Sequence, residues 1–374
     1  MSNQDDLGHV IVIGGCGFVG HHIVSLLLSR HPKTIVSTLD LRTSRNRIAN
    51  PNAFYYDCDI TDLAALQQLF AKLKPNAVIH TASPVAFGIP PSVMLKVNVD
   101  GTNNLLRAAQ DVGVKAFVFT SSASVIMDAE NDLVNADERW PVITGKAQPE
   151  YYTHTKGLAE LAVLKANRST DGFLTCAIRP AGIFGPGDVQ MLPGLLQASR
   201  KGQSKFQLGP NTNLFDFTYV ENIAHGHLLA LVGLLHTSKL TTTPLDHERI
   251  DGEAFFITND SPVYFWDMAR RVWKEAGDQN ALNPAAIWVL GTQFALTIAT
   301  IMEWVMWIFG KVPNLNRTKV RYSVMTRYYS VDKAKMRLGY TPIVELEEGI
   351  RRGVKAMLEN EAQQQKSLSE KKGQ

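Results

Sequence analysis

The stretch that decides the fold is VIVIGGCGFVG, residues 10–20. Its four apolar residues, 10–13, form a short continuous run, which is typical of a parallel strand buried on both faces. Three glycines at G-x-x-G-x-x-G spacing follow, and apolar residues at helical spacing come next. Glycine permits a positive φ and a close approach of the backbone to a pyrophosphate, and the helix N-terminus supplies N–H donors. The stretch therefore predicts a dinucleotide-binding loop, with cofactor contacts from Gly14, Gly17, Phe18, Val19 and Gly20.

The same alternation of strand and helix continues outward from this loop. Apolar runs that predict strands lie at residues 34–39, 54–57, 77–81, 116–120 and 174–178. Segments with helical spacing lie between them, at residues 63–72, 102–112 and 152–167. Such alternation predicts an α/β fold with a doubly wound parallel sheet of the Rossmann type, whose ligands bind beyond the carboxyl ends of the strands.

The pattern loosens after residue 182. We expect residues 8–182 to form mainly the dinucleotide-binding domain and residues 183–360 to form mainly a smaller, C-terminal substrate domain. The last residues, 361–374, are poor in apolar side chains, which predicts a disordered tail.

Composition narrows the class of protein. The chain has 374 residues, of which 45% are hydrophobic and 20% charged, and this balance excludes a largely disordered protein. The formal net charge of +3 is too small to favour a nucleic-acid partner. Three widely spaced cysteines indicate a reducing compartment, and the histidines lack metal-ligand spacing, so no metal site is expected.

Further residues are placed to touch a dinucleotide. Asp40 ends the second predicted strand, where a carboxylate binds the adenosine ribose hydroxyls and favours NAD over NADP. Arg42 and Arg45 argue the other way, because a nearby arginine can accept a 2′-phosphate, so NADP stays open. Turns after the third and fourth strands would pass the adenine and the cofactor backbone, and their residues are Asp59, Ile60, Thr81, Ala82 and Ser83.

The pattern Y-x-x-x-K at Tyr152 and Lys156 predicts proton-transfer chemistry. Residues four apart share a helix face, so both side chains can reach one site. A free tyrosine has a pKa near 10, and a neighbouring ammonium is expected to lower that pKa and to help a phenolate form. Ser122 follows the fifth strand and is expected to orient the substrate oxygen, with Ser124 as its competitor. Tyr152, Lys156 and Ser122 are thus the predicted catalytic residues.

One segment, residues 285–310, departs from the pattern of a soluble domain. Its apolar length approaches the roughly 20 residues of a membrane span, and tryptophans lie near its ends, as at membrane interfaces. Three interpretations stay open at this point: a buried helical hairpin or a substrate-domain helix, attachment to a membrane surface or a lid that opens toward lipid, and a true span.

Together these motifs resemble the 3β-hydroxysteroid dehydrogenase branch of the extended short-chain dehydrogenases, and in particular its fungal sterol-4α-carboxylate dehydrogenases. The resemblance rests on GGCGFVG (14–20), TSSASV (120–125), YYTHTK (151–156) and, most specifically, RPAGIFGPGD (179–188). Further matches lie at residues 213–230, 255–273 and 325–340, so nearly the whole chain is covered. The resemblance implies Ser-Tyr-Lys roles for the three predicted catalytic residues. It also implies a place beside the nicotinamide for Arg179, Pro180, Ala181 and Gly182. The family commonly has Arg-Gln after GPGD, whereas this chain has Val189-Gln190.

The resemblance implies NAD(P)-dependent oxidation of a 3β-hydroxyl on a sterol or triterpenoid, with loss of a C4 carboxylate as CO2. It also implies a location at the cytoplasmic face of the endoplasmic-reticulum membrane, which agrees with the apolar segment. Whether the chain forms a homodimer stays open. Two other functions stay open. One is a nucleotide-sugar epimerase or dehydratase on the same fold, and the other is a regulatory protein that binds the nicotinamide without catalysis.

Overall fold

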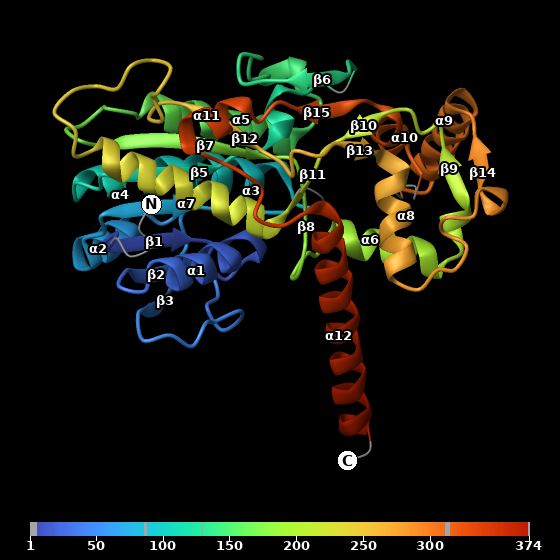
Figure 1. Ribbon diagram of the computed structural model, residues 1–374, viewed down its shortest axis with the longest axis horizontal. Coiled ribbons are helices and arrows are strands. Elements are labelled where there is room, and N and C mark those ends of the chain that lie inside the picture. Colours follow the sequence, from blue (N-terminus) through green and yellow to red (C-terminus); the bar gives the residue numbers. More distant parts are fainter. Residues whose placement is uncertain (1–5, 86–87, 129, 311–314, 373–374) are drawn as a thin grey trace.

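The centre of the molecule is a seven-stranded sheet in the order β12-β7-β5-β4-β1-β2-β3 (Figure 1). The computed structural model describes residues 6–85, 88–128, 130–310 and 315–372. All neighbouring pairs in this sheet are parallel. The strands are β1 (His9–Ile13), β2 (Ile35–Asp40), β3 (Ala53–Asp57), β4 (Ala77–His80), β5 (Ala116–Thr120), β7 (Leu174–Pro180) and β12 (Ala254–Ile257). The predicted doubly wound parallel sheet is confirmed.

Alternating side chains of β1 explain why helices cover both faces of the sheet. Val10 and Val12 pack into one hydrophobic core, and Ile11 and Ile13 pack into the other. The first core contains side chains of α1 (Phe18–Arg30), α7 (Val220–Thr237) and α11 (Asp332–Leu338). The second contains side chains of α2 (Leu63–Leu73), α4 (Gly101–Asp111) and α5 (Tyr151–Lys165).

The strand order reverses between β1 and β4. From β1 the chain adds β2 and β3 on one side, and then returns to place β4 against the other side of β1. Connections from these two strands diverge at their carboxyl ends, which is where open α/β sheets bind ligands. The glycine-rich turn follows β1 and residue Thr81 follows β4, so the fold brings both to this point.

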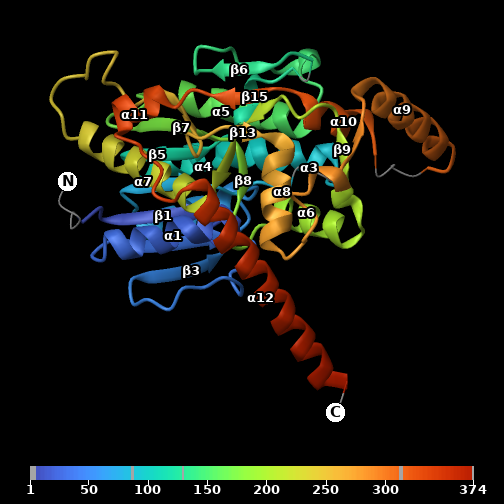
Figure 2. The same ribbon diagram turned by 45° about the vertical axis from the view of Figure 1, so that its right-hand side comes forward.

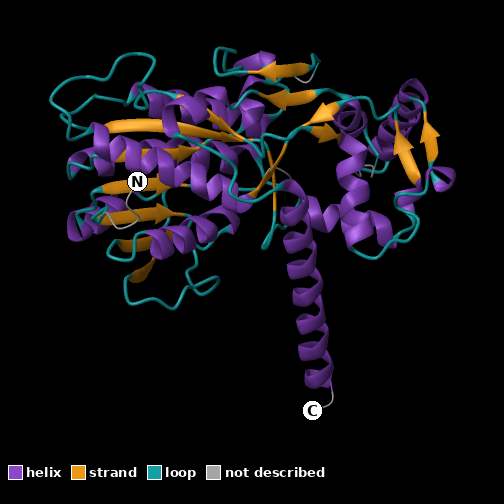
Figure 3. Cartoon of the chain, viewed as in Figure 1, coloured by secondary structure: helices purple, strands orange, loops and turns teal. Residues whose placement is uncertain are grey.

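A second group of elements, with short strands, lies beyond the carboxyl edge of the large sheet (Figure 3). Its four-stranded sheet has the order β13-β10-β15-β6, and β11-β8 and β14-β9 form two-stranded pairs. The strands are β6 (Leu133–Ala136), β8 (Gly182–Phe184), β9 (Phe206–Leu208), β10 (Leu214–Phe215), β11 (Phe217–Tyr219), β13 (Val263–Tyr264), β14 (Trp288–Leu290) and β15 (Arg327–Tyr329). The helices are α6 (Met191–Arg200), α8 (Phe265–Glu275), α9 (Thr292–Ile308), α10 (Arg317–Val324) and α12 (Leu346–Lys372).

The chain crosses the expected boundary at residue 182 in both directions. β12, α7 and α11 come from the second half of the sequence but complete the large sheet and its helical layer. β6 comes from the first half but belongs to the four-stranded sheet. The two regions therefore share chain segments, and residues from both halves can meet at the carboxyl edge of the large sheet.

The chain end differs from the expected disordered tail. Helix α12 continues to Lys372 and extends away from the body in two views (Figures 1 and 2). Leu346, Ile350 and Val354 anchor its first turns in a hydrophobic core, and the later turns are mostly exposed. Composition alone misses this helix because Glu, Gln, Lys and Ala are polar or small yet are also good helix formers.

Residues 285–310 form the short strand β14 and the helix α9. Figure 2 shows α9 at the outer edge of the molecule. Of its residues only Ala295 and Ala299 are buried, so the interpretation as a buried hairpin is wrong. These two alanines pack against Val320 of α10, as a helix of the substrate domain would. Among the described residues, no helix combines the length and the apolar character that crossing a bilayer requires.

Candidate active site

The glycine-rich turn has a backbone that other residues could not adopt without displacement. Gly14 has a φ of +76°, and a Cβ on it would lie 2.8 Å from the backbone nitrogen of Ala82. A Cβ on Gly20 would lie 2.2 Å from the Gly14 carbonyl oxygen. Helix α1 begins directly afterwards with Gly17 as its N-cap, so the N–H groups of the first turn, including those of Phe18 and Val19, receive no side-chain cap. This cradle and the positive end of the helix fit a dinucleotide diphosphate.

The turn after β4 lies against the glycine-rich turn. The Thr81 hydroxyl donates to the carbonyl of Ile13 at 2.8 Å, which ties the ends of β4 and β1 together. Ala82 forms the opposite wall of the cradle at Gly14. The Ser83 hydroxyl donates to the Asn98 side chain at 2.9 Å. Thr81 and Ala82 thus line one side of the cradle, whereas the Ser83 hydroxyl points to Asn98, and the contacts of all three residues with a cofactor stay predictions.

The acidic residues predicted at the adenosine end have different surroundings. Asp40 is at the end of β2, and its carboxylate accepts the N–H of Cys16, inside the glycine-rich turn, at 3.2 Å. Asp59 instead accepts the N–H of Thr61 at 2.8 Å in a local turn. Ile60 is buried and packs closely over Gly101 of α4. Only Asp40 has a carboxylate in contact with the cradle, and the adenine roles of Asp59 and Ile60 stay predictions.

Tyr152 and Lys156 lie one turn apart near the start of α5, against the carboxyl end of β5. The Lys156 ammonium donates to the carbonyl oxygen of Thr120 at 2.6 Å and lies 4.6 Å from the centre of the Phe119 ring. Lys156 is buried, and Tyr152 is partly buried. The structure therefore holds Lys156 at the same strand end from which Ser122 follows.

Burial governs the protonation of both groups. Burial raises the pKa of the Tyr152 phenol above its ordinary value, and a hydrogen bond with the Ser83 side chain offsets part of this rise. Burial lowers the pKa of Lys156 to about 7, against the opposing charge of Glu160. The prediction that Tyr152 has a lowered pKa is therefore wrong in this structure, because the loss of hydration outweighs any help from the lysine. Lys156 is instead available in both charge states near neutral pH.

Ser122 and Ser124 are hydrogen-bonded to each other at the entrance to a short 3-10 turn, η2 (Ala123–Ile126). The Ser122 hydroxyl donates to the Ser124 hydroxyl at 3.1 Å and accepts the backbone N–H of Ser124. Ser124 also accepts a hydrogen bond from Arg327 at 2.9 Å. The two competing serines thus belong to one network, with Ser122 nearer to the end of β5.

The side chain of Arg179 is buried and forms an ion pair within the protein. Its guanidinium makes several hydrogen bonds to the buried carboxylate of Glu160 on α5 and lies over the Phe256 ring. This pair joins β7 to the helix that holds Tyr152 and Lys156. Pro180 ends β7, and Gly182 begins β8 after Ala181. Any contact of these four residues with a nicotinamide stays a prediction, and for Arg179 the Nε and Nη2 atoms are already bonded to Glu160.

Sequence reasoning missed a buried amide that supports the site. Asn98 lies in the one-turn π segment η1 (Lys96–Asp100), accepts from Ser83 and donates to the Thr155 hydroxyl at 3.0 Å. It thus links the turn after β4 to α5. A π segment inside a helix often marks a functional site, but it requires backbone geometry to be seen and the sequence carries no motif for it. Arg327 was missed for the same reason, since β15 lies far along the chain from the serines that it contacts.

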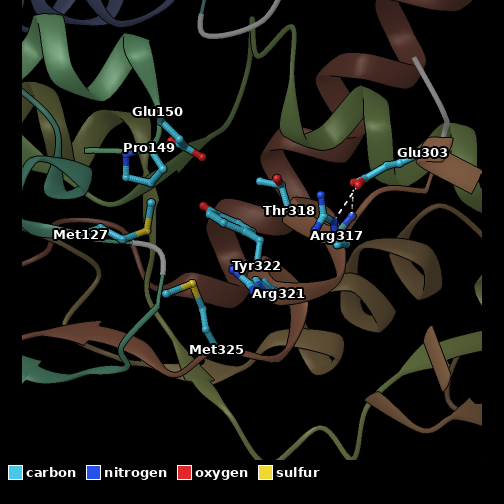
Figure 4. A pocket seen from close by; sticks show the side chains of 9 residues that line it. All are labelled: Met127, Pro149, Glu150, Glu303, Arg317, Thr318, Arg321, Tyr322 and Met325. Carbon is cyan, nitrogen blue, oxygen red and sulfur yellow. Dashed lines mark hydrogen bonds and ion pairs between the residues drawn. The ribbon is translucent and has the colours of Figure 1, made fainter. Parts of the chain in front are cut away.

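A cavity of about 280 Å³ opens beside the start of α5 (Figure 4). Its lining joins segments from both halves of the chain: Met127, Pro149, Glu150, Glu303, Arg317, Thr318, Arg321, Tyr322 and Met325. The methionines, the proline and the tyrosine ring supply apolar walls. On the far side Arg317 is paired with Glu303 of α9 at 2.7 Å. The cavity therefore extends from the residues before Tyr152 to the exposed helix α9.

Comparisons with known proteins agree on one family. Residues 11–284 match the sequence model of the 3-beta hydroxysteroid dehydrogenase/isomerase family. The decarboxylating sterol-4-alpha-carboxylate 3-dehydrogenase of Saccharomyces cerevisiae is 40% identical, over 91% of this chain and 95% of its own length. The protein of the same name from Homo sapiens is 36% identical, over 95% of this chain and 89% of its own length.

Solved structures show likeness at the level of the fold. An epimerase from Methanothermobacter thermautotrophicus has a TM-score of 0.71 at 24% identity, covering 97% of this chain and 95% of its own. The UDP-glucose 4-epimerase of Thermotoga maritima has a TM-score of 0.68 at 21% identity, covering 94% and 99%. Because both identities are low, the likeness carries the fold and gives no support to a nucleotide-sugar substrate.

Proposed function

The chain belongs to the 3-beta hydroxysteroid dehydrogenase/isomerase family, and from this premise we propose that it oxidises the 3β-hydroxyl of a 4-carboxysterol, or of a triterpenoid with the same first ring. Oxidation gives a β-keto acid, which then loses its C4 carboxylate as CO2. The relatives named above act on this class of substrate by name. The observation that carries the proposal is the position of Lys156 and Tyr152, one turn apart on α5, at the strand end that also leads to Ser122.

NAD is the cofactor that fits best. The cradle at Gly14 and Gly20 and the free N-terminus of α1 would hold its diphosphate. Asp40, whose carboxylate contacts the glycine-rich turn, would accept the ribose hydroxyls and repel a 2′-phosphate. The chemistry that NAD supplies when bound is acceptance of the hydride that leaves C3.

Protein groups handle the proton. Tyr152 takes the proton of the C3 hydroxyl as the ketone forms, and the Ser122 hydroxyl turns from Ser124 to donate a hydrogen bond to the same oxygen and fix its direction. Because the pKa of Tyr152 is raised, its phenolate needs a nearby positive charge. Lys156, with a pKa of about 7, can take up a proton and supply that charge at neutral pH. Below about pH 7 we expect activity to rise with pH as more phenolate forms, and above it to level off, because Lys156 then loses the charge that stabilises the phenolate.

Decarboxylation requires little further machinery. In the β-keto acid, the bond between C4 and the carboxyl carbon breaks and CO2 leaves. The electron pair moves to the C3 oxygen as an enolate, and C4 later takes up a proton. Ser122 and Tyr152 can hydrogen-bond the enolate oxygen at the position where they held the alcohol.

We also propose that β14 and α9 attach the enzyme to a membrane surface, at the cytoplasmic face of the endoplasmic reticulum. The exposed apolar side chains of this segment include Trp288, Phe294, Ile301, Trp304, Val305, Trp307, Ile308 and Phe309. Tryptophans with such exposure are suited to the interfacial layer of a bilayer. Glu303 of the same helix lines the cavity, so a lipid substrate could pass from the membrane toward Tyr152.

Incubation of the purified chain with a 4α-carboxysterol and either NAD or NADP tests the reaction. Mass spectrometry should detect a 3-ketosterol that has lost CO2, formed faster with NAD. A product that keeps its carboxylate would refute the decarboxylation, and no product with either cofactor would refute the proposed activity.

A further inference from the structure

Arg327 is a buried cation at the edge of the candidate site. It begins β15, and only 4% of its surface is exposed. Its Nε donates to the Tyr329 hydroxyl at 2.6 Å, and its Nη2 donates to the Ser124 hydroxyl at 2.9 Å. The rings of Tyr322 and Phe215 lie 5.3 and 5.6 Å from its Cζ. Hydroxyls and aromatic rings thus hold the guanidinium in place.

These contacts differ from those of the other buried arginines. Arg179 is paired with Glu160, and Arg270 with Asp267. Within the described part of the chain, no carboxylate oxygen lies close enough to the Arg327 guanidinium, at 4.0 Å or less, to form an ion pair with it. A buried charge is costly unless an opposite charge accompanies it. The surroundings of Arg327 are therefore prepared for an anion that comes from outside the chain.

Two acidic side chains act on Arg327 only at longer range. Glu150 and Asp216 both favour its charged form. Burial raises the pKa of Asp216 to about 7, so this carboxyl is only partly ionised at neutral pH. Glu150 lines the cavity and accepts a hydrogen bond from Thr153 at 3.2 Å. Neither group neutralises the guanidinium by direct contact.

The position of Arg327 matches the shape of a 3-hydroxy-4-carboxylate. In such a substrate the carboxylate is on the carbon next to the one that bears the alcohol. Ser122, which we assign to the alcohol oxygen, donates to Ser124, and Ser124 accepts from Arg327. Only the Ser124 hydroxyl thus lies between Ser122 and the Arg327 guanidinium. This close spacing suits an alcohol and a carboxylate on neighbouring carbon atoms of one substrate.

The nearby cavity offers room for the hydrocarbon rings. Tyr322 both lines the cavity and lies against Arg327, and Met325 lines it two residues before Arg327 (Figure 4). A ligand whose apolar rings fill this cavity could therefore direct a polar end toward Arg327 and the serines.

We propose that Arg327 binds the C4 carboxylate of the substrate and selects sterols that carry one. This inference rests on the proposed function and adds a specificity-determining residue to it. The ion pair is present in the alcohol and in the β-keto acid, and it is lost when CO2 leaves and the negative charge moves to the C3 oxygen. Loss of Arg327 should therefore weaken substrate binding without slowing the loss of CO2.

Equilibrium binding of two unreactive probes tests the assignment. The first is a 4α-carboxysterol that lacks the 3-hydroxyl, and the second is its 4α-methyl counterpart. The wild-type chain, with NAD present, should prefer the carboxylate probe. Arg327→Gln should weaken binding of that probe by roughly 10- to 100-fold and leave the methyl probe nearly unchanged. Arg327→Lys keeps the positive charge but loses the planar guanidinium that can bind both carboxylate oxygens. It should therefore lose part of the preference for the carboxylate probe.

The control is Arg270→Gln, which removes a buried arginine that is paired within the chain. It should keep the full preference for the carboxylate probe. An unchanged preference in either Arg327 variant would overturn the assignment, and the lysine variant retains the charge if the glutamine variant fails to fold. Turnover of a 4α-carboxysterol by the wild type is measured in parallel. Its absence refutes the proposed function, whereas turnover with an unchanged preference refutes only the role of Arg327.

Discussion

The large sheet and the segment β14–α9 contain similar apolar side chains in opposite surroundings. All five residues of β5 are buried, whereas α9 buries only two alanines and leaves Trp304 and Trp307 73% and 78% exposed. Burial of the strand is explained by helices of this chain on both faces. Nothing among the described residues covers the outer face of α9 in the same way. The apolar residues of the sheet therefore form the core of the fold, whereas the exposed apolar residues of α9 support the proposed attachment to a membrane surface.

The largest expected effect is on turnover, from a substitution at the carboxyl end of β5. Tyr152→Phe removes the hydroxyl that exchanges the proton and keeps the packing of the ring. We expect turnover to fall by roughly 10²- to 10⁴-fold, with NAD affinity nearly unchanged. Steady-state kinetics and NAD titration measure the two quantities. Near-normal turnover would remove Tyr152 from the mechanism.

The glycine cradle gives the next largest effect. Gly20→Ala places a Cβ 2.2 Å from the Gly14 carbonyl oxygen, so the loop must shift. Overpacking of this kind costs about 1–3 kcal/mol, which corresponds to roughly 5- to 150-fold weaker NAD binding if the loop bears the strain. Gly194→Ala in α6 is the matched control, because its Cβ would meet no atom within 4 Å. Equal NAD affinities in the two variants would argue against the cradle.

Replacement of exposed tryptophans on α9 tests whether this surface binds a membrane. The double variant Trp304→Glu and Trp307→Glu should bind vesicles of phosphatidylcholine and phosphatidylinositol roughly tenfold more weakly. Its free energy of unfolding should change little, since both rings are already exposed. Leu245→Glu alters a similarly exposed side chain elsewhere and should leave vesicle binding unchanged. Co-sedimentation distinguishes these outcomes.

The last prediction is a pH dependence of stability from Lys156, which acts on folding and leaves both surfaces in place. Its pKa is about 7 in the folded chain and near 10.5 when hydrated. Between these values the unfolded chain holds a proton that the folded chain lacks. The free energy of unfolding therefore gains at most about 1.4 kcal/mol per pH unit from this group as the pH rises. Lys156→Met should lose this contribution. Denaturant unfolding between about pH 7 and about pH 9 measures it, and parallel curves for the two proteins would contradict it.

Much of the fold was predictable because its signals are local. The strands of the large sheet are short apolar runs, and β1, β3 and β4 lead directly into helices, so periodicity places the strands within a residue or two. The exchange of segments across residue 182 was not predictable, since β6 and β12 are assigned to their sheets by contacts distant in sequence. Helix α12 was missed because polar composition does not distinguish a solvated helix from disorder.

The candidate site was predictable where a motif fixes backbone geometry, and less so where burial decides. Glycine spacing anticipated the cradle at Gly14 and Gly20. The pKa of Tyr152 was predicted in the wrong direction, because the sequence shows the neighbouring lysine but not the loss of hydration. Asn98 and Arg327 carry no local motif, and their partners come from distant segments. The catalytic roles and a homodimer stay predictions.

The fate of the hydrogen at C3 tests the central claim most directly. A 4α-carboxysterol with deuterium on C3 is incubated with the purified chain and NAD, and the reduced nicotinamide and the CO2 are analysed by mass spectrometry. We predict that deuterium appears in the reduced nicotinamide in proportion to the CO2 released, and that Tyr152→Phe suppresses both. Release of CO2 with the deuterium still on C3 would contradict oxidation as the first step.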